Sequence, residues 1–410
     1  MRRKLSGFVV SAGLLATACG GSTAAPSPSI GSAVVIGTAI SLTGSQSKEG
    51  QLAKQGYDLW KAWIDQQGGI TVNGVKHPVT LLYEDDQSKP DISATLVQKL
   101  ITDEKAQFIL GPYGSGATAT DAVVVEKNGI PMVEANGAAQ AIFNKGYKYT
   151  FGVLSPANKY LTGVIDMAAT LNPKPTTLAM LTANDNFSVE VAKAVVDYAP
   201  SKGFTVVFNK SYPAAAPDLS GLLSQVKPLN PDIILNSGHL AEAIAINKAA
   251  KDLNINAKIF AYSVGPSTPD FIQALGKDAN YVYDGSQWTP QVKYTPSFYL
   301  SVSQYVQAYK TKYNSSDPPD YHVAESTAGC LALQKAMENA KSLDPAKVRD
   351  ALAALDVMTF FGELKFDSRG INTFKPMVVE QIQDGVHYTV YPPDVANGQP
   401  KYPTPSWSQR

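Results

Sequence analysis

The chain has 410 residues, of which 44% are hydrophobic, and its 35 basic and 35 acidic side chains give a formal net charge of zero. This composition lacks the clustered Lys and Arg that nucleic-acid binding needs, so we expect no nucleic-acid partner. The apolar content excludes general disorder, and the length favours two domains of roughly 100–200 residues each.

The first twenty residues have the pattern of a secretory signal. Residues 2–4 are basic, and a short apolar stretch over 8–15 is followed by small residues and Cys19. That stretch is too short to span a bilayer, which needs about 20 residues. The segment LATAC at 15–19 resembles a bacterial lipobox, although Ala16 stands where Leu is preferred. The resemblance implies cleavage before Cys19 and lipid attachment to it; a plain signal peptide with an incidental cysteine is the alternative.

This N-terminal pattern predicts where the mature protein works. We expect residues 1–18 to be removed, and residues 19–33, rich in small residues and Pro, to form a flexible tether. The folded part would then lie outside the cytoplasm, anchored by lipid to the bacterial membrane. The second cysteine, Cys330, lies within a helical pattern and is expected to be a buried free thiol.

Strands and helices alternate along the chain after the tether. We predict, in order, a strand at 34–40, a helix at 51–64, a hairpin turn at Asn73-Gly74, a strand at 80–83, a helix at 90–102, a strand at 108–110, a helix at 115–127 and a strand at 131–133. The alternation restarts with a strand at 177–181, then a helix at 188–202, a strand at 204–208, a helix at 219–227, a strand at 232–235, a helix at 240–253 and a strand at 258–262. Such alternation indicates parallel sheets, and two runs of it indicate an α/β fold with two doubly wound lobes.

The chain after Trp288 does not begin a third lobe. Helices at 298–313 and 322–340 are expected to cover the first lobe, and short strands at 362–366 and 377–383 to form edges of the second. The domains are therefore lobe 1 at 34–152 and 290–358, lobe 2 at 153–289 and 359–391, and an irregular tail at 392–410.

Ligands of open α/β sheets bind beyond the carboxyl ends of the strands, where loops converge. The predicted strands place the candidate binding loops at 41–48, 112–115, 135–138, 183–187, 237–239 and 262–266. The segment 287–290 lies where the chain crosses back between the lobes. A cleft between two such lobes is a usual place for a small-molecule site.

Six stretches of the chain resemble one known family. They are 36–90 (beginning IGTAISLTG), 108–119 (FILGPYGSGATA), 130–139 (IPMVEANGAA), 181–194 (LTANDNFSVEVAKA), 318–329 (PPDYHVAESTAG) and 360–370 (FFGELKFDSRG). Over about 34–387 they resemble type I periplasmic binding proteins, the substrate-binding components of branched-chain amino-acid-type ABC transporters. The resemblance implies two lobes joined by a three-strand hinge, closure on a small-molecule ligand, and delivery to ABC permease subunits. We expect a monomer with no cofactor.

The resemblance also assigns ligand-binding residues in the first lobe. Ser115 and Gly116 begin a predicted helix, whose unpaired N–H groups and dipole favour an anion. Capping that helix is the other role open to Ser115, and the two roles are compatible. The loop of Asn136, Gly137 and Ala138 corresponds to the one that holds an amino acid's carboxylate in the family, but Ala138 replaces the usual Thr.

Three further positions depart from the family pattern. Phe187 replaces a Tyr that flanks the ligand, and Glu49 stands where an aromatic residue often covers the pocket. Asn280 falls where amino-acid binders place an acid against the ligand's ammonium group. A site for a zwitterion needs partners for both charges, because unpaired buried charge is costly. These changes indicate a ligand other than a standard aliphatic amino acid.

Aromatic and neutral polar groups outnumber ions on the candidate loops. Tyr113, Phe187, His239 and Trp288 all lie there. We therefore expect an aromatic acid or amide, with a carboxylate held at Ser115. For Trp288 packing in the hinge is the alternative, and for His239 a structural cap or a surface role.

Other classes of function fit the sequence less well. Residues 114–119 match the dinucleotide fingerprint G-x-G-x-x-[G/A], with Glu134 about 20 residues further on, which would indicate an oxidoreductase. However, Pro112-Tyr113 separates the strand from the first glycine, and export removes the protein from the dinucleotide pool. The sequence has no G-x-S-x-G, no P-loop and no metal-binding histidine spacing, so we expect neither an enzyme nor a metal site. A ligand sensor on the same fold is the second alternative; transport is favoured because the chain supplies no transmembrane relay.

Overall fold

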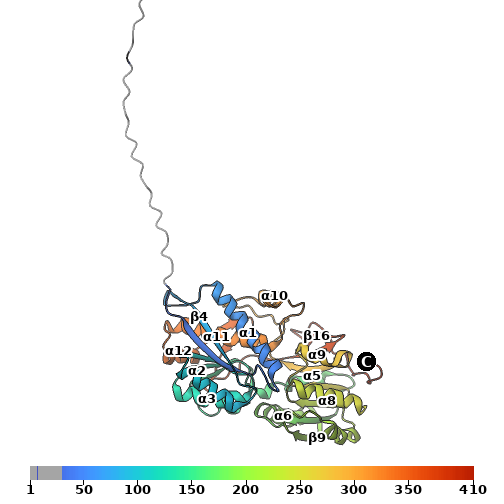
Figure 1. The fold of residues 1–410 in the computed structure, drawn as a ribbon. Coiled ribbons are helices and arrows are strands. Elements are labelled where there is room, and N and C mark those ends of the chain that lie inside the picture. The colour runs from blue at the N-terminus through green and yellow to red at the C-terminus, as the bar shows by residue number, and fades with distance from the viewer. Residues whose placement is uncertain (1–6, 8–29) are drawn as a thin grey trace, which may run out of the picture.

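The computed structural model describes Gly7 and residues 30–410, which form two lobes side by side (Figure 1). The rest of the predicted signal segment, Cys19 and most of the predicted tether lie outside the described residues. Within the part that is described, no helix is long and apolar enough to cross a membrane.

Lobe 1 is built on a parallel five-stranded sheet in the order β4-β1-β5-β6-β7. Its strands are β1 (Val34–Ile40), β4 (Val79–Asp85), β5 (Phe108–Leu110), β6 (Met132–Glu134) and β7 (Thr150–Gly152). Its helices are α1 (Ser47–Gln66), α2 (Pro90–Thr102), α3 (Ser115–Asn128), α4 (Gln140–Phe143), α10 (Val302–Tyr313), α11 (Tyr321–Ala340) and α12 (Pro345–Ala353). The central strands are almost wholly buried, which explains their continuous apolar sequences.

A small hairpin joins β2 (Ile70–Val72) to β3 (Val75–His77) in lobe 1. Its two turn residues, Asn73 and Gly74, both have positive φ, at 50° and 82°. This is the conformation that a two-residue hairpin turn requires, so the turn predicted from Asn-Gly is confirmed.

Lobe 2 is built on a seven-stranded sheet in the order β16-β15-β12-β11-β10-β8-β9. The parallel strands are β8 (Thr177–Ala183), β9 (Thr205–Tyr212), β10 (Ile233–Ser237), β11 (Ile259–Tyr262) and β12 (Val282–Ser286), and the antiparallel ones are β15 (Val378–Gln383) and β16 (Val386–Tyr391). Its helices are α5 (Thr162–Thr170), α6 (Asn186–Tyr198), α7 (Ser220–Val226), α8 (Leu240–Asp252) and α9 (Pro269–Leu275), and its 3₁₀ turns are η1 (Ala157–Lys159), η2 (Ala199–Lys202), η3 (Lys227–Leu229) and η4 (Gly276–Ala279). The prediction of two doubly wound α/β lobes is confirmed.

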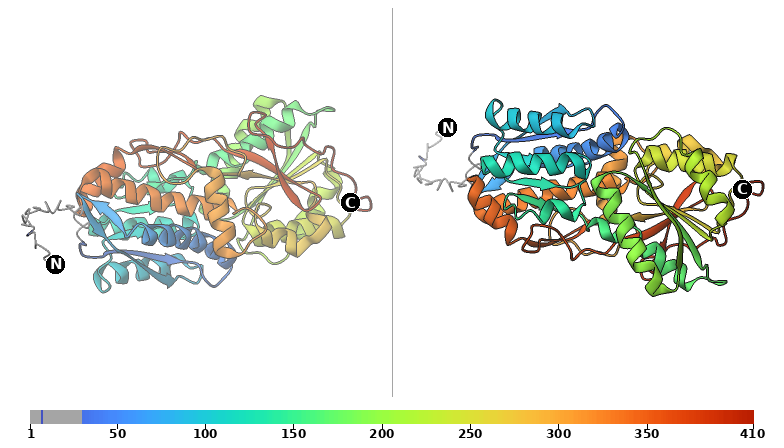
Figure 2. Two further views of the ribbon diagram at one scale, coloured as in Figure 1. Left: turned by 90° about the horizontal axis from the view of Figure 1, so that it is seen from above. Right: turned by 90° about the horizontal axis from the view of Figure 1, so that it is seen from below.

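Helices from late in the chain complete lobe 1, as the views from above and below show (Figure 2). The α11 helix packs closely against α1, because Gly56 has no side chain: a Cβ there would lie 2.3 Å from the Val323 carbonyl oxygen. Trp60 Nε1 donates to Gln334 Oε1 across the same interface, at 2.9 Å. Cys330 of α11 is a fully buried free thiol, as predicted.

The prediction for residues 362–366 is wrong. Instead of an edge strand of lobe 2, β14 (Gly362–Lys365) pairs with β13 (Asp356–Thr359) in a hairpin, and its turn residues Phe360 and Phe361 are buried in the core of lobe 1. The hairpin forms locally, and the two aromatic rings hold it to lobe 1. Ile371 still bridges Gly152 at β7, so the third crossing to lobe 2 comes after Ile371 rather than at residues 358–359.

The other two crossings follow β7 and β12 and, with the third, make up the hinge. The last residues, 392–410, contain no helix or strand within the described chain, yet they pack on lobe 2. Trp407 is buried against it, and its Nε1 donates to the Ile255 carbonyl at 2.6 Å. The tail is thus a covering segment of lobe 2.

Candidate functional site

The loops at the carboxyl ends of both sheets meet in a small cavity between the lobes, here called the interlobe cavity. The space between its lining atoms is about 260 Å³ when the open mouth is included, but the interior itself is only about 10 Å³, room for about one water molecule. The residues that line it are Tyr113, Gly114, Ser115, Asn136, Tyr160, Phe187, His239, Val264, Tyr321, His322 and Glu325. Five of the ten positions chosen from the sequence are among them: Tyr113, Ser115, Asn136, Phe187 and His239.

The wall from lobe 1 is the start of α3 and the loop after β6. Ser115 is the first residue of α3, and its Oγ accepts from the Ala139 N–H at 3.1 Å instead of capping its own helix. Its O–H proton is therefore available to a ligand beside the first N–H groups of α3. Asn136 Nδ2 donates to Ser326 Oγ at 3.0 Å, which leaves Asn136 Oδ1 without a partner among the described residues.

Gly116, Gly137 and Ala138 shape this wall without lining the cavity. A Cβ on Gly137 would lie 2.2 Å from Thr118 Oγ1, so only glycine fits there. Ala138 is buried, and its carbonyl accepts from the Ala157 N–H of η1 at 2.9 Å. The loop is thus held in place by backbone contacts on its far side.

Glu134 has a structural position beneath the same loop. Its carboxylate accepts from the Asn136 N–H and from Thr118 Oγ1 (2.8 Å), and burial raises its pKa to about 7. Glu134 does not line the cavity. The dinucleotide fingerprint would require Glu134 to bind a ribose, but its carboxylate is hydrogen-bonded to the loop instead.

The wall from lobe 2 carries the charge of the cavity. His239 is the N-cap residue of α8, and its Nδ1 lies 3.1 Å from Tyr113 Oη while its Nε2 lies 3.6 Å from Asp185 Oδ2. Burial lowers the pKa of His239, but the hydrogen bond and negative charge of Asp185 outweigh burial and raise it to about 9. This environment favours the imidazolium form of His239, in which both ring nitrogens carry protons.

Aromatic rings surround this cation. Phe187, near the start of α6, meets Tyr160 edge to face with ring centroids 4.8 Å apart, and its ring lies 5.8 Å from that of His239. Tyr113 and Tyr321 add two more rings to the lining. The lining therefore presents aromatic rings beside one positive charge.

The start of α11 supplies lining residues that the sequence reasoning missed: Tyr321, His322 and Glu325. Glu325 is 1% exposed, its Oε2 has no hydrogen-bond partner among the described residues, and burial raises its pKa well above the usual range. The sequence predicts the helix at 322–340 as cover for lobe 1, and the resemblance over 318–329 assigns no ligand-binding residue there. A signal was present in Glu325, because a charged residue in an otherwise small and apolar helix is seldom buried without a function.

Several contacts join the lobes around the cavity, in addition to the Tyr113–His239 contact. Glu49 is one of them: its Oε1 accepts from the Leu240 N–H at the start of α8, at 3.1 Å. Glu190 of α6 accepts from the first two N–H groups of α4, at 2.7 and 2.8 Å. Lys48 pairs with Asp270 at 2.8 Å. Glu49 thus connects the lobes and does not line the interlobe cavity.

Trp288 and Asn280 lie away from the interlobe cavity. Trp288 Nε1 donates to the Phe360 carbonyl at 2.9 Å, and its ring meets Tyr305 edge to face. Asn280 precedes β12 at the amino edge of the sheet, where its Oδ1 accepts from the Gly385 N–H at 2.8 Å. It therefore cannot face a ligand bound at the carboxyl edge. Among the described residues, no cluster of His, Cys, Asp and Glu could hold a metal ion.

Comparison with known proteins agrees with this architecture. A relative named Leu/Ile/Val-binding protein homolog 7, from Brucella suis, is 24% identical over 385 residues, which cover 90% of this chain and 94% of the relative. The homolog 8 protein of Brucella abortus is 25% identical over 379 residues, which cover 88% and 91%.

Solved structures show the same fold. A leucine-binding protein from Thermotoga maritima has a TM-score of 0.76 at 21% identity, covering 87% of this chain and 97% of that one. A solute-binding protein of an ABC transporter from R. palustris, in complex with benzoate, has a TM-score of 0.73 at 17% identity, covering 90% and 98%. A family model described as periplasmic binding protein matches residues 33–386, and the chain therefore belongs to the periplasmic binding protein family.

Proposed function

We propose that the protein is the extracytoplasmic solute-binding component of an ABC importer, and that it captures a small aromatic acid in the interlobe cavity. The observation that carries this proposal is the charge of the lining. The hydrogen bond and charge of Asp185 favour the positive form of His239, whereas burial raises the pKa of Glu325 well above the usual range and so disfavours its negative form. The cavity thus favours a ligand with one negative charge.

The geometry supports one orientation of such a ligand. Its carboxylate would lie between the start of α3 at Ser115 and the His239 ring, where N–H and O–H donors converge. Its ring would take the place among Tyr160, Phe187 and Tyr321. The benzoate complex of a protein with the same fold supports a ligand of this class.

Glu325 also favours a second candidate, an aromatic amino acid. Its unpartnered Oε2 could accept from a ligand ammonium group, and a nearby cation would lower the pKa of this carboxyl. The two candidates differ in one respect: only the amino acid requires an ionised Glu325.

Binding would proceed by closure of the lobes. The ligand first contacts lobe 1 near Ser115, and lobe 2 then brings Phe187 and His239 over it. Glu49, Glu190 and the Lys48–Asp270 pair stabilise only the closed arrangement, because each contact spans both lobes. A ligand favours closure only through contacts that the open form lacks, and the lobe 2 residues provide them. Delivery to a permease would follow from the closed form.

Calorimetry with four ligands tests the proposal: benzoate, benzamide, phenylalanine and leucine. Benzoate should bind, benzamide should bind more weakly because it lacks the charge, and leucine should not bind. Tight binding of leucine with none of benzoate would contradict the proposal. Phenylalanine binding that is lost in Glu325→Gln, with benzoate binding kept, would support the second candidate.

The lipid anchor is a separate part of the proposal and rests on the sequence at 15–19. Expressed in a bacterial host, the protein should fractionate with membranes, and Cys19→Ala should release it in soluble form. If the protein with Cys19 intact were also found in the soluble fraction, an anchor at Cys19 would be contradicted. Size-exclusion chromatography of the mature chain should show a monomer.

A further inference from the structure

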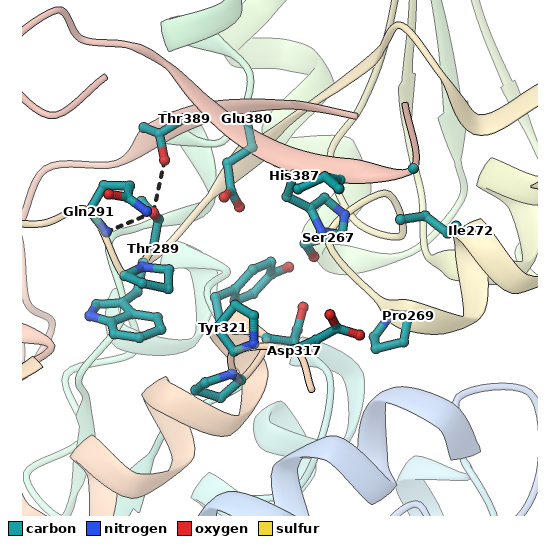
Figure 3. A pocket seen from close by; sticks show the side chains of 17 residues that line it. Ser267, Pro269, Ile272, Thr289, Gln291, Asp317, Tyr321, Glu380, His387 and Thr389 are labelled. Atoms are coloured by element: carbon teal, nitrogen blue, oxygen red, sulfur yellow. Dashed lines mark hydrogen bonds between the residues drawn. The ribbon is translucent and has the colours of Figure 1, made fainter. Parts of the chain in front are cut away.

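A second pocket lies beside the hinge and shares Tyr321 with the interlobe cavity. We call it the hinge pocket. Lobe 2 contributes Ser267, Glu380 and His387, lobe 1 contributes the loop from Asp317 to Tyr321, and the crossing segment Trp288–Gln291 closes one end (Figure 3). Its empty space, counted out to the open mouth, is about 960 Å³. The pocket is thus larger than the interlobe cavity and is also walled by both lobes.

Carboxyl groups from both lobes face this space. Asp317 and Asp320 come from the loop before α11, and Glu380 comes from β15, while no Lys or Arg is among the lining residues. His387 is the one lining side chain that can be cationic, and its Nε2 lies 2.7 Å from the Pro266 carbonyl. Figure 3 shows Glu380 pointing into the pocket opposite Tyr321 and Asp317.

The acidic character extends into the sheet below. Glu380 pairs directly with Asp284 across the antiparallel strands β15 and β12, so the two side chains lie on the same face. Like charges at such a position destabilise a sheet. Burial raises the pKa of both groups, and the negative charge of Glu380 raises that of Asp284 further, whereas His387 and a hydrogen bond from Ser286 lower that of Glu380. A cation beside Glu380 would relieve this repulsion.

Buried polar atoms at the pocket also lack partners. Ser267 Oγ, Tyr321 Oη and Asp320 Oδ2 form no hydrogen bond within the described chain, although these residues are 7%, 2% and 8% exposed. Asp320 Oδ1 is occupied, because His322 Nδ1 lies 2.6 Å from it. Buried polar atoms without partners are uncommon in folded proteins. A bound molecule with hydrogen-bond donors would supply the partners that these three atoms lack.

The remaining wall is apolar, and the carboxyl groups are too dispersed for a metal. Within the described residues none of them belongs to a cluster able to hold a metal ion. Ile272, Pro269, Pro290 and Val386 offer contact to a hydrocarbon group instead. Carboxylates with an apolar wall fit an organic cation better than a hydrated ion.

We propose that the hinge pocket binds the ammonium group of a small organic amine between Glu380 of lobe 2 and Asp320 and Tyr321 of lobe 1. Of its three N–H donors, two would meet Asp320 Oδ2 and Tyr321 Oη, which lack partners, and the third would meet the Glu380 carboxyl. Because its partners come from both lobes, a bound amine stabilises the closed form and strengthens ligand binding in the interlobe cavity. This inference does not rest on the identity of the ligand in that cavity.

The test uses n-butylamine as the probe, with butyrate and 1-butanol as matched controls of negative and zero charge. The mature chain is labelled with 5-fluorotryptophan, and the resonance of Trp288, assigned with Trp288→Phe, reports on the pocket. Butylamine should shift this resonance saturably, and butyrate and butanol should not. Absence of saturation, or shifts confined to the other tryptophans, would overturn the proposal.

Two variants show whether the carboxyl groups are responsible. Glu380→Gln should weaken butylamine binding about tenfold, as expected for loss of a charged hydrogen bond. Asp252→Asn removes an exposed carboxyl near the end of α8, outside the pocket lining, and should leave binding unchanged. If Glu380→Gln fails to fold, the exposed Asp317→Asn serves in its place, with an expected weakening of a few-fold. Equal affinity in the pocket variant and in Asp252→Asn would overturn the proposal.

Discussion

The interlobe cavity and the hinge pocket share one residue, Tyr321, but differ in charge. The interlobe cavity is built around the imidazolium of His239, whereas Asp317, Asp320 and Glu380 face the hinge pocket. Both are lined by residues of the two lobes, so a ligand bound in either can stabilise the closed form. A chain with no net charge can therefore contain two pockets whose charged groups have opposite signs.

The source of the difference lies in the partners of the charged groups. Asp185 holds the proton on His239 and brings the positive charge into a buried site. In the hinge pocket Glu380 faces Asp284 across the sheet, and no Lys or Arg lines the pocket. Changing a single partner should therefore alter the affinity of one site directly and that of the other only through closure of the lobes.

Replacing the cation should have the largest effect on ligand binding. His239→Gln keeps a polar side chain but removes the charge, and we expect benzoate to bind about 100-fold more weakly, because a hydrogen bond to a charged group contributes about 1.5–3 kcal/mol. Calorimetry measures the change, and butylamine binding in the hinge pocket serves as the control. Unchanged benzoate affinity would remove His239 from the site.

The same group predicts a pH dependence. Its folded pKa is raised to about 9, so His239 keeps its proton below that pH and loses it above. Benzoate affinity should thus be constant from about pH 6 to 8 and fall by about tenfold per unit above pH 9. Asp185→Asn can still accept from the Ser188 N–H but lacks the negative charge that raises the pKa of His239. In this variant the affinity for benzoate should therefore fall at a lower pH. A fall at the same pH in both proteins would contradict the assignment to His239.

Loss of the aromatic wall should have the next largest effect. Phe187→Ala removes a buried ring that touches the cavity, and we expect aromatic acids to bind about tenfold more weakly, from the apolar contact that is lost. Phe187→Tyr keeps the ring and should stay within a few-fold of the unmodified protein. Circular dichroism checks that both variants fold. Equal weakening by both would point to the backbone rather than to the ring.

Ser115→Ala should weaken benzoate binding less, by about fivefold, as expected for one neutral hydrogen bond of about 1 kcal/mol. It should also lower the thermal midpoint, because the buried Ala139 N–H loses its acceptor. Ser115→Thr keeps the hydroxyl and should restore much of both properties. A lower midpoint with unchanged affinity would show that Ser115 only supports the loop.

Much of the fold follows from the sequence, because strands buried on both faces leave continuous apolar runs such as VVIGTAI. The β13–β14 hairpin did not follow. Its strands, DVMT and GELK, alternate between more and less buried residues as an edge strand of either lobe could, and only the packing of Phe360 and Phe361 in lobe 1 decides where they lie. Local patterns cannot supply that long-range contact.

The residues of the site likewise include some that the sequence predicts and some that it does not. Ser115, Asn136 and His239 follow strands directly, so the rule for strand ends reached them. Glu325 lies on a helix that is buried nearly all round, where periodicity does not show which residue faces the cavity. Asn280 was misplaced because its alignment put it at the wrong end of β12.

Trp288 gives the smallest expected effect on ligand binding and separates a role in the hinge from a role in the interlobe cavity. Trp288→Phe should leave benzoate affinity within about twofold, because the ring packs on Tyr305 and Phe360 and does not line that cavity. The variant should still lose stability, since the buried Phe360 carbonyl loses its donor, at a cost of about 1–3 kcal/mol. Chemical denaturation and calorimetry on the same sample measure both quantities. A large loss of benzoate affinity without a loss of stability would place Trp288 at the ligand and remove the distinction between the two pockets.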